Sequence, residues 1–320
     1  MLSTYVDAGG SMRLDGLLSF PLTPFTADRA DVAWPSLADH LERQLAAGPA
    51  ALFVACGTGE LTALSPAEYE RVVRTAVAVT AGRVPVLAGV GGGPQVAREN
   101  LAAARRAGAD GALLLPPYLV ESTPAGLVEH VRWVAAGGGL PVIVYQRANA
   151  VLDPAAAVAL LDIDEVAGIK DGRGDVDAML RIVTAIRHSG HRRAAEFRFL
   201  NGLPTAELSA AAYAAIGVAA YSSAVLTFVP DLATAFHAAV TGGDEATTGA
   251  LLAAFYLPFA ELRARAPGYA VALVKAGARL SGQDVGGVRP PLCDPSPEHE
   301  QRLAAIVAAG RDTLAEVRRG

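Results

Sequence analysis

Hydrophobic residues in this chain gather in eight short runs that alternate with longer, alanine-rich stretches. Each run is four to six residues long and mostly apolar, which is typical of a strand buried on both faces. The stretches between the runs are long enough for helices. We predict strands at residues 17–20, 51–55, 85–90, 111–115, 141–145, 166–170, 197–201 and 217–222.

Helix start signals stand in the intervals between the predicted strands. Ser65 precedes Pro66 and Glu68, a combination that favours a helix beginning at the proline. The prediction therefore alternates strands and helices along most of the chain. Similar signals recur at Pro94, Thr123-Pro124 and Asp153-Pro154, where Thr123 and Asp153 are the candidate N-caps.

Eight consecutive strand–helix units predict an α/β fold, specifically a (β/α)₈ TIM barrel with a C-terminal helical extension. The structural rival is a doubly wound sheet, which usually carries a glycine-rich nucleotide loop after its first strand. Here residues 21–25 read Pro-Leu-Thr-Pro-Phe, and the two prolines have no N–H groups to offer a pyrophosphate. Segment 89–94 is rich in glycine, but Pro94 stands where that loop needs glycine.

The pattern divides the chain into three parts. Residues 1–15 form an N-terminal extension, residues 16–241 form the catalytic barrel, and residues 242–320 form a C-terminal helical module. A helix near residues 231–240 completes the barrel. The module has no separate catalytic pattern and carries helical stretches near residues 244–265, 268–281 and 297–318.

Composition narrows the range of functions. The chain is 52% hydrophobic and 18% charged with a formal net charge of −5, and this mild acidity argues against nucleic-acid binding. The two cysteines, Cys56 and Cys293, lie far apart and suggest neither a disulfide framework nor a zinc site. No secretory or membrane-spanning pattern stands out, so we expect a cytoplasmic protein that does not bind membranes.

Lys170 ends the apolar run 166–170, where a charged ammonium group is costly to bury. Burial would lower the pKa of the amine and free it as a nucleophile toward a carbonyl. Alternatively, the side chain leaves the strand, reaches solvent and pairs with Asp171, because lysines readily extend their charged ends to water. The segment alone leaves both interpretations open.

Active sites of TIM barrels lie at the C-terminal ends of the strands. Those ends bring together a lysine, tyrosines, an arginine and several hydroxyls, which suit a keto acid: an amine for the ketone, and N–H and O–H donors for carboxylates. The six histidines stand at none of these ends, so we expect no metal. The segments are Phe20-Pro21, Gly57-Thr58-Gly59-Glu60, Pro116-Pro117-Tyr118, Tyr145-Gln146-Arg147, Lys170-Asp171, Asn201-Gly202 and Tyr221-Ser222-Ser223.

Three landmarks occur in a characteristic order: the Gly57-Thr58-Gly59-Glu60 turn, Tyr145 and Lys170. Together they resemble the dihydrodipicolinate synthase/N-acetylneuraminate lyase family of Schiff-base aldolases and dehydratases. Further segments resemble the members of that family that dehydrate sugar diacids, and they extend the resemblance over nearly the whole chain. These segments are residues 168–175, 201–207, 221–225, 275–279 and 288–292.

The resemblance implies a role for each residue at the barrel mouth. Lys170 would form an imine with the ketone while Tyr145 shuttles protons, and no cofactor beyond this covalent imine is implied. Thr58 and the backbone N–H groups around Gly57 and Gly59 would bind the adjacent carboxylate. The candidates for the distal end of the substrate are Arg147, Ser222, Ser223 and Asn201, and Tyr118 is a candidate for either a site role or a subunit contact.

The chain departs from the synthases of the family in two places. Gly57 stands where they usually carry a threonine, so a proton relay through Tyr118 would lack one hydroxyl. Gln146-Arg147-Ala148-Asn149 follows Tyr145, where the synthases have an Asn-Val-Pro pattern. Both departures favour a dehydratase over an enzyme that condenses pyruvate with an aldehyde.

The implied reaction is that of a decarboxylating hydro-lyase, which converts 5-dehydro-4-deoxy-D-glucarate to 2,5-dioxopentanoate, water and carbon dioxide. The alternatives are a Schiff-base aldolase or lyase of another 2-keto-3-deoxy sugar acid, a dihydrodipicolinate synthase-like condensing enzyme, and a barrel that only binds its ligand. The resemblance also implies a homo-oligomer, either a dimer or a tetramer. We expect structural roles for Glu60, which would bond loop amides, and for Cys56, a small buried residue.

Overall fold

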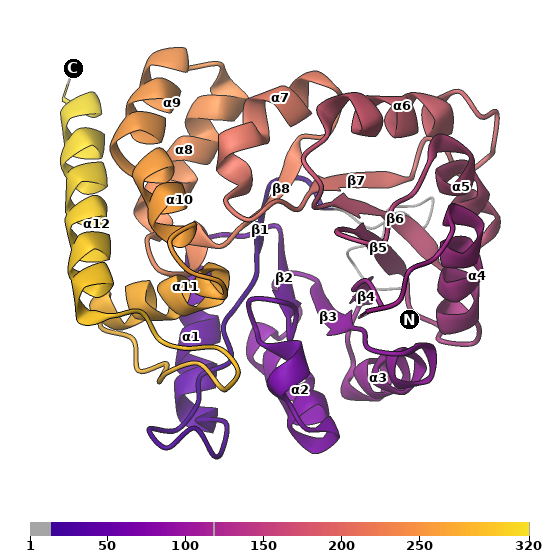
Figure 1. Ribbon diagram of the computed structural model, residues 1–320, viewed down its shortest axis with the longest axis horizontal. Helices are drawn as coiled ribbons and strands as arrows, with labels where there is room; N and C mark the ends of the chain where they lie inside the picture. Colours follow the sequence, from indigo (N-terminus) through magenta and orange to yellow (C-terminus); the bar gives the residue numbers. More distant parts are fainter. Residues whose placement is uncertain (1–13, 118, 320) are drawn as a thin grey trace.

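The computed structural model describes residues 14–117 and 119–319 and shows a closed barrel of eight parallel strands (Figure 1). The strands follow one another around the barrel in chain order, and β8 pairs with β1 to close it. This confirms the predicted (β/α)₈ barrel. The strands are β1 (Leu17–Ser19), β2 (Ala51–Val54), β3 (Val86–Val90), β4 (Gly111–Leu114), β5 (Val142–Gln146), β6 (Val166–Asp171), β7 (Arg198–Asn201) and β8 (Ala220–Ser223).

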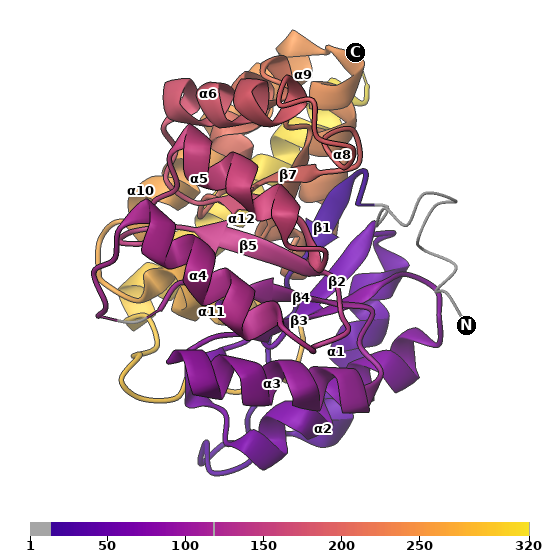
Figure 2. The ribbon, with the colours of Figure 1, turned by 90° about the vertical axis from the view of Figure 1, so that its right-hand side faces the viewer.

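Helices surround the barrel and continue beyond it (Figure 2). Those of the barrel are α1 (Trp34–Ala46), α2 (Pro66–Thr80), α3 (Pro94–Ala107), α4 (Pro124–Ala135), α5 (Pro154–Ala159), α6 (Val176–Arg187), α7 (Ala210–Ala215) and α8 (Pro230–Gly242). The tail adds α9 (Glu245–Leu251), a π-helical turn (Leu252–Tyr256), α10 (Leu257–Arg263), α11 (Tyr269–Leu280) and α12 (Pro297–Val317). No helix in the described part of the chain is long and apolar enough to cross a membrane.

The predicted helix starts are confirmed. The Ser65 side chain accepts a hydrogen bond from the backbone N–H of Glu68, whose carboxylate accepts one from the N–H of Ser65, so α2 begins with a complete capping box. Thr123 and Asp153 cap α4 and α5 in the predicted way. Local side-chain chemistry therefore fixes where these helices begin.

The predicted strands match the observed ones within one residue at each end, except at the start of β8. That strand begins at Ala220, three residues later than predicted. Gly217 adopts a φ of 85°, and the N–H of Val218 donates to the carbonyl of Tyr213. Residues 217–219 therefore form the connection that follows α7, and the strand begins only at Ala220.

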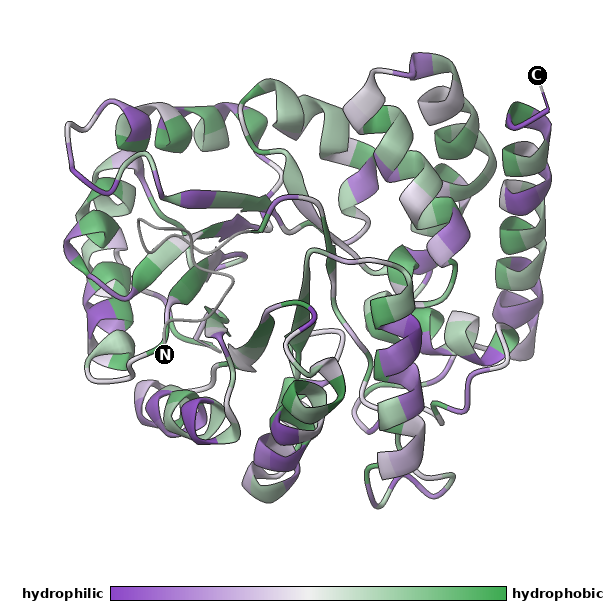
Figure 3. Cartoon of the chain, turned by 180° about the vertical axis from the view of Figure 1, so that it is seen from behind, coloured by the Kyte–Doolittle hydropathy of each residue, from purple (hydrophilic) through white to green (hydrophobic). Residues whose placement is uncertain are grey.

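Three hydrophobic cores hold the molecule together. One lies inside the barrel, and a larger one lies between the sheet and the surrounding helices. In the third core, the helices from α8 through α12 pack against Leu17 of β1 and Tyr221 of β8, so the tail packs on the barrel wall. In Figure 3 hydrophobic residues run along the strands, while the helices carry both hydrophobic and hydrophilic residues.

The C-terminal helices lie on one side of the barrel, with α12 along their outer edge (Figure 1). The predicted stretch 244–265 is divided by the π-helical turn into α9 and α10, and the other two predicted tail helices are present. The division of the chain at residues 241 and 242 stays a prediction, and the predicted extension lies largely outside the described residues.

Candidate active site

Lys170 lies on β6 with its side chain inside the barrel, where it is only 4% exposed. Its Nζ atom donates a hydrogen bond to the carbonyl oxygen of Gly202 at 3.3 Å. It also lies 3.8 Å from the ring centroid of Tyr145 and 4.9 Å from that of Phe20. None of the ion pairs among the described residues includes Lys170, so the amine is buried without a counter-charge.

An irregularity in the sheet sets the direction of this side chain. Val142 of β5 pairs with Val166, but the next residue, Ile143, pairs with Gly168, so β6 carries one extra residue at Ala167. Val166 packs against the helices outside the barrel. Strict alternation would place Lys170 on that same outer face, and the extra residue turns Lys170 inward beside Tyr145, its partner in the register.

The environment of Lys170 lowers the pKa of its amine. Burial lowers the pKa of the amine, and the positive charge of Arg147 acts in the same direction, while Tyr145 and Cys56 oppose the shift. A lower pKa leaves more of the amine neutral, and the neutral amine has the lone pair that attacks a carbonyl.

The alternative in which Lys170 reaches solvent and pairs with Asp171 is wrong. Asp171 is also buried, and its carboxylate lies on the outer face of β6. There it accepts hydrogen bonds from the Nε2 group of Gln146 at 2.8 Å and from the hydroxyl of Tyr213. Neighbouring strand residues point to opposite faces of a sheet, so these two charged groups are separated by the strand itself.

Tyr145 lies near the end of β5 beside Lys170, and its hydroxyl donates to the carbonyl of Gly202 at 2.9 Å. The amine and the phenol therefore share one acceptor. The amine and the phenol also lie so close to the backbone at two glycine positions that a Cβ atom there would collide with them. A Cβ atom at position 202 would lie 2.6 Å from Nζ of Lys170, and one at position 172 would lie 2.7 Å from the hydroxyl of Tyr145. Only glycine fits at these positions.

A cavity of about 310 Å³ opens above Lys170 at the C-terminal ends of the strands. Its size falls at the lower end of the range for small-molecule sites, roughly 300–1,000 Å³. The structure brings most of the predicted site residues to this cavity. Those that line it are Gly57, Thr58, Tyr145, Arg147, Lys170 and Ser222.

Three predicted residues stand elsewhere, and their placement corrects the prediction. Ser223 is fully buried behind the wall, where its hydroxyl donates to Glu207 at 2.6 Å and accepts from the N–H of Leu226. The side-chain amide of Asn201 donates to Ala206 and Ser209 and stabilises the turn after β7. Gly59 shapes the turn without lining the cavity. Tyr118 lies outside the described residues.

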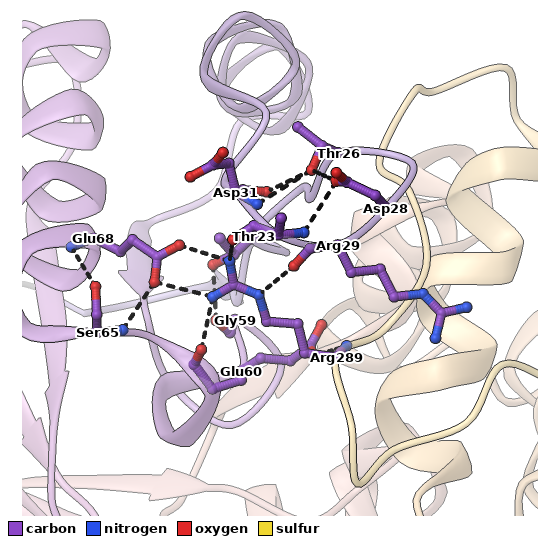
Figure 4. A network of polar contacts seen from close by, with 12 residues as sticks. Thr23, Thr26, Asp28, Arg29, Asp31, Gly59, Glu60, Ser65, Glu68 and Arg289 are labelled. Atoms are coloured by element: carbon purple, nitrogen blue, oxygen red, sulfur yellow. Dashed lines mark hydrogen bonds and ion pairs between the residues drawn. The ribbon is translucent and has the colours of Figure 1, made fainter.

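The buried carboxylate of Glu60 stabilises the turn that carries Thr58, which is the structural role predicted for this residue. Its partners, however, come from the distant C-terminal tail. Glu60 forms an ion pair with Lys275 at 2.8 Å and accepts a hydrogen bond from the backbone N–H of Arg289 at 3.0 Å. The Arg289 guanidinium also pairs with Glu68 at 2.6 Å, and Figure 4 shows it between α2 and the loop after β1.

Tail residues also line the cavity, which the sequence pattern did not predict. Because they are far from the barrel strands in sequence, periodicity carries no signal for them; they are Gly268, Ala270, Val271 and Leu292. Pro204 and Thr205, from the loop after β7, are further lining residues that were missed. Cys56 is a buried wall residue as expected, and burial raises the pKa of its thiol to about 12.

Fold and site together define an α/β barrel built for chemistry at a buried amine, and no cluster of metal-binding side chains exists among residues 14–117 and 119–319. The chain matches the Dihydrodipicolinate synthetase family over residues 13–310 and belongs to that family.

Two relatives show which proteins of the family this chain is similar to over most of its length. A Streptomyces coelicolor protein named "Probable 5-dehydro-4-deoxyglucarate dehydratase 1" is 51% identical over 301 residues, which cover 94% of each chain. A Rhizobium rhizogenes protein named "Probable 5-dehydro-4-deoxyglucarate dehydratase" is 45% identical and covers 92% of this chain and 95% of its own.

Solved structures share the fold. Dihydrodipicolinate synthase from Oceanobacillus iheyensis superposes with a TM-score of 0.84 at 24% identity, covering 92% of this chain and 96% of that chain. YagE from E. coli, a member of the same family solved in complex with pyruvate, gives a TM-score of 0.82 at 25% identity over 92% and 98% of the two chains. The fold of this chain thus recurs over nearly the whole length of both structures.

Proposed function

We propose that this protein is a decarboxylating dehydratase that converts 5-dehydro-4-deoxy-D-glucarate to 2,5-dioxopentanoate, water and carbon dioxide. The observation that carries the proposal is the buried, unpaired amine of Lys170 beside Tyr145 and the Thr58 turn. The names of relatives about half identical to this chain supply the substrate.

The first step joins the substrate ketone to Lys170. Thr58 and the backbone N–H groups of its turn bind the carboxylate next to the ketone and fix its orientation. The neutral amine of Lys170 attacks the ketone, and water leaves as the imine forms. Tyr145 moves protons between the amine and the departing oxygen, for which its hydroxyl is well placed on the shared carbonyl of Gly202.

The protonated imine then acts as the electron sink for both bond cleavages. It acidifies the adjacent CH₂ group, and loss of a proton from that carbon gives an enamine that expels the neighbouring hydroxyl as water. The carbon–carbon double bond that forms connects the imine to the carbon bearing the distal carboxylate. The electron pair of the breaking C–CO₂ bond can therefore flow to the imine nitrogen, and protonation with hydrolysis releases the aldehyde product.

This scheme needs no cofactor beyond the imine on Lys170. Arg147 and Ser222 line the cavity and are the proposed ligands for the distal part of the substrate. Asn201 and Ser223 act indirectly, because they hold the ends of β7 and β8. The cytoplasmic location and the dimeric or tetrameric assembly stay predictions.

The direct test is an assay with 5-dehydro-4-deoxy-D-glucarate that follows carbon dioxide and the aldehyde product. The wild-type protein should release both in equal amounts, and Lys170→Ala should release neither. Free pyruvate in place of carbon dioxide would instead identify an aldolase. Keto acids that bind without any turnover would identify a barrel that serves only as a binding protein.

A further inference from the structure

A second arginine reaches the cavity region from the C-terminal tail. Arg263 lies at the end of α10, and its Nη1 group donates a hydrogen bond to the hydroxyl of Thr205. Thr205 lines the cavity, as does Arg147 from the loop after β5. Arg147 therefore lines the cavity itself, while the guanidinium group of Arg263 contacts a residue that lines it.

Neither arginine has an acidic partner. Within the described ranges no ion pair includes Arg147 or Arg263, and Arg263 makes one side-chain hydrogen bond although a guanidinium has five N–H donors. Arg263 is half-buried. Burial lowers its pKa, the positive charge of Arg147 adds to that shift, and Glu207 opposes it. Two like charges held near each other without a counter-ion are suited to receive an anion.

The nearest acid does not supply that anion. Glu207 is buried behind the cavity wall, where it accepts the hydroxyl of Ser223 at 2.6 Å. Burial raises the pKa of Glu207 to about 7, so its carboxyl group is partly protonated at neutral pH. Glu207 therefore offsets the charge of Arg263 only in part and forms no ion pair with it among the described residues.

Thr205 adds a second sign of a built site. Its φ of 58° lies in the left-handed region, which is unfavourable for a β-branched residue. Such conformations persist where the surrounding structure holds them, and they gather at ligand sites. Here the loop after β7 and the hydrogen bond from Arg263 hold the Thr205 hydroxyl at the cavity.

We propose that Arg263, together with Arg147, binds the distal carboxylate of a six-carbon keto diacid and so selects diacids over monoacids. This inference rests on the proposed function, because it assigns the end of the substrate that Lys170 does not hold. The tail thereby contributes a specificity residue to the barrel site. Since the distal carboxylate loses its charge as carbon dioxide forms, Arg263 stabilises the bound substrate at least as strongly as the transition state. Its loss should raise KM more than it lowers kcat.

The test compares two keto acids that differ only at the far end. 2-Oxoadipate carries a distal carboxylate, and 2-oxohexanoate carries a methyl group in its place. Cyanoborohydride traps either acid on Lys170, so the concentration that gives half-maximal trapping measures binding without any need for turnover. We expect the wild-type protein to prefer 2-oxoadipate by about 10- to 100-fold, the range of hydrogen bonds between charged groups.

Arg263→Gln should remove most of this preference and leave the trapping of pyruvate unchanged. Arg263→Lys should retain part of the preference, because the positive charge remains but the planar guanidinium group, which can donate two parallel hydrogen bonds to a carboxylate, is lost. The matched control is Arg265→Gln, two residues further on, where the side chain is exposed; it should behave as the wild type.

Several results would overturn the inference. These are a wild type without preference for the diacid, an Arg263→Gln variant that keeps the preference, or an equal loss for all three acids, which would indicate a purely structural role. Failure of the proposed function is a separate result. It would appear as absent carbon dioxide release from 5-dehydro-4-deoxy-D-glucarate by a wild-type protein whose diacid preference is intact.

Discussion

The two buried lysines of this protein have opposite surroundings. Lys275 of α11 is fully buried, yet it pairs with Glu60 at 2.8 Å, donates to the carbonyl of Gly287 at 2.8 Å and lies 3.9 Å from the ring centroid of Phe25. Lys170 is also buried but has no acid beside it. We propose that the absence of a counter-charge, more than burial itself, makes Lys170 a nucleophile while Lys275 remains a structural cation.

Burial lowers the pKa of both amines, and the two differ in the groups that oppose the shift. Burial lowers the pKa of Lys275 to about 8, and the charge and hydrogen bond of Glu60 oppose the shift, so this amine stays mostly charged at neutral pH. Burial also lowers the pKa of Lys170, where Tyr145 and Cys56 oppose the shift and Arg147 reinforces it. Lysine occurs only at these two positions. Apart from histidine, every other basic residue of the sequence is arginine.

The largest effect should come from Lys170→Met. Removing the amine abolishes imine formation, so turnover should fall by at least about 10⁴-fold. The thermal midpoint should stay the same or rise, because a buried polar group is replaced by an apolar one of similar shape. Carbon dioxide release and a thermal scan measure the two effects. Residual turnover above this level would show that another group does the chemistry.

Tyr145→Phe should lower kcat by about 10²- to 10⁴-fold, the range typical of a lost acid–base group. The ring under Lys170 is retained, so binding of pyruvate should change little. Stopped-flow measurement of imine formation checks this. A variant that forms the imine at the wild-type rate would remove Tyr145 from the proton transfers.

Lys275→Met should act on stability and spare the chemistry at Lys170. Removing one partner of a buried ion pair leaves the Glu60 carboxylate uncompensated, which costs about 3–5 kcal/mol of unfolding free energy. Adding Glu60→Leu should restore part of that loss, since an apolar pair leaves no buried charge. Urea titration of the single and double variants provides the values. Full loss of trapping on Lys170 in a folded Lys275→Met protein would contradict the division of roles.

The smallest expected effect is a shift in pH dependence. The rate of trapping on Lys170 should rise as pH increases, because deprotonation exposes the lone pair, and its midpoint should lie below the ordinary lysine pKa of about 10.4. Arg147→Gln removes a charge that lowers the pKa of Lys170, so the midpoint should move to higher pH. Initial trapping rates across the pH range measure it. A shift to lower pH would contradict the electrostatic assignment.

Much of the fold follows from the sequence, because runs of buried strands and capped helices are local signals. The direction of Lys170 does not, since it depends on the extra residue at Ala167 that reverses the alternation along β6. Alternation does distinguish Ser222, which lines the cavity, from Ser223, which lies behind it. Applied to β7, where Leu200 points into the barrel, the same rule places Asn201 outside.

The contributions of the tail are the part that sequence patterns could not reveal. Lys275, Arg289 and Arg263 reach the site through contacts with residues that lie far away along the chain. No periodic pattern records such contacts. The sequence does show that only two lysines are present, which limits the candidate side-chain amines to Lys170 and Lys275.

The scarcity of lysine makes one measurement decisive. The protein would be treated with pyruvate and cyanoborohydride, digested, and its peptides mapped by mass spectrometry. A single reduced adduct on Lys170, with Lys275 unmodified, is the predicted result. An adduct on Lys275, or none on either lysine, would contradict the claim that the unpaired amine inside the barrel is the nucleophile.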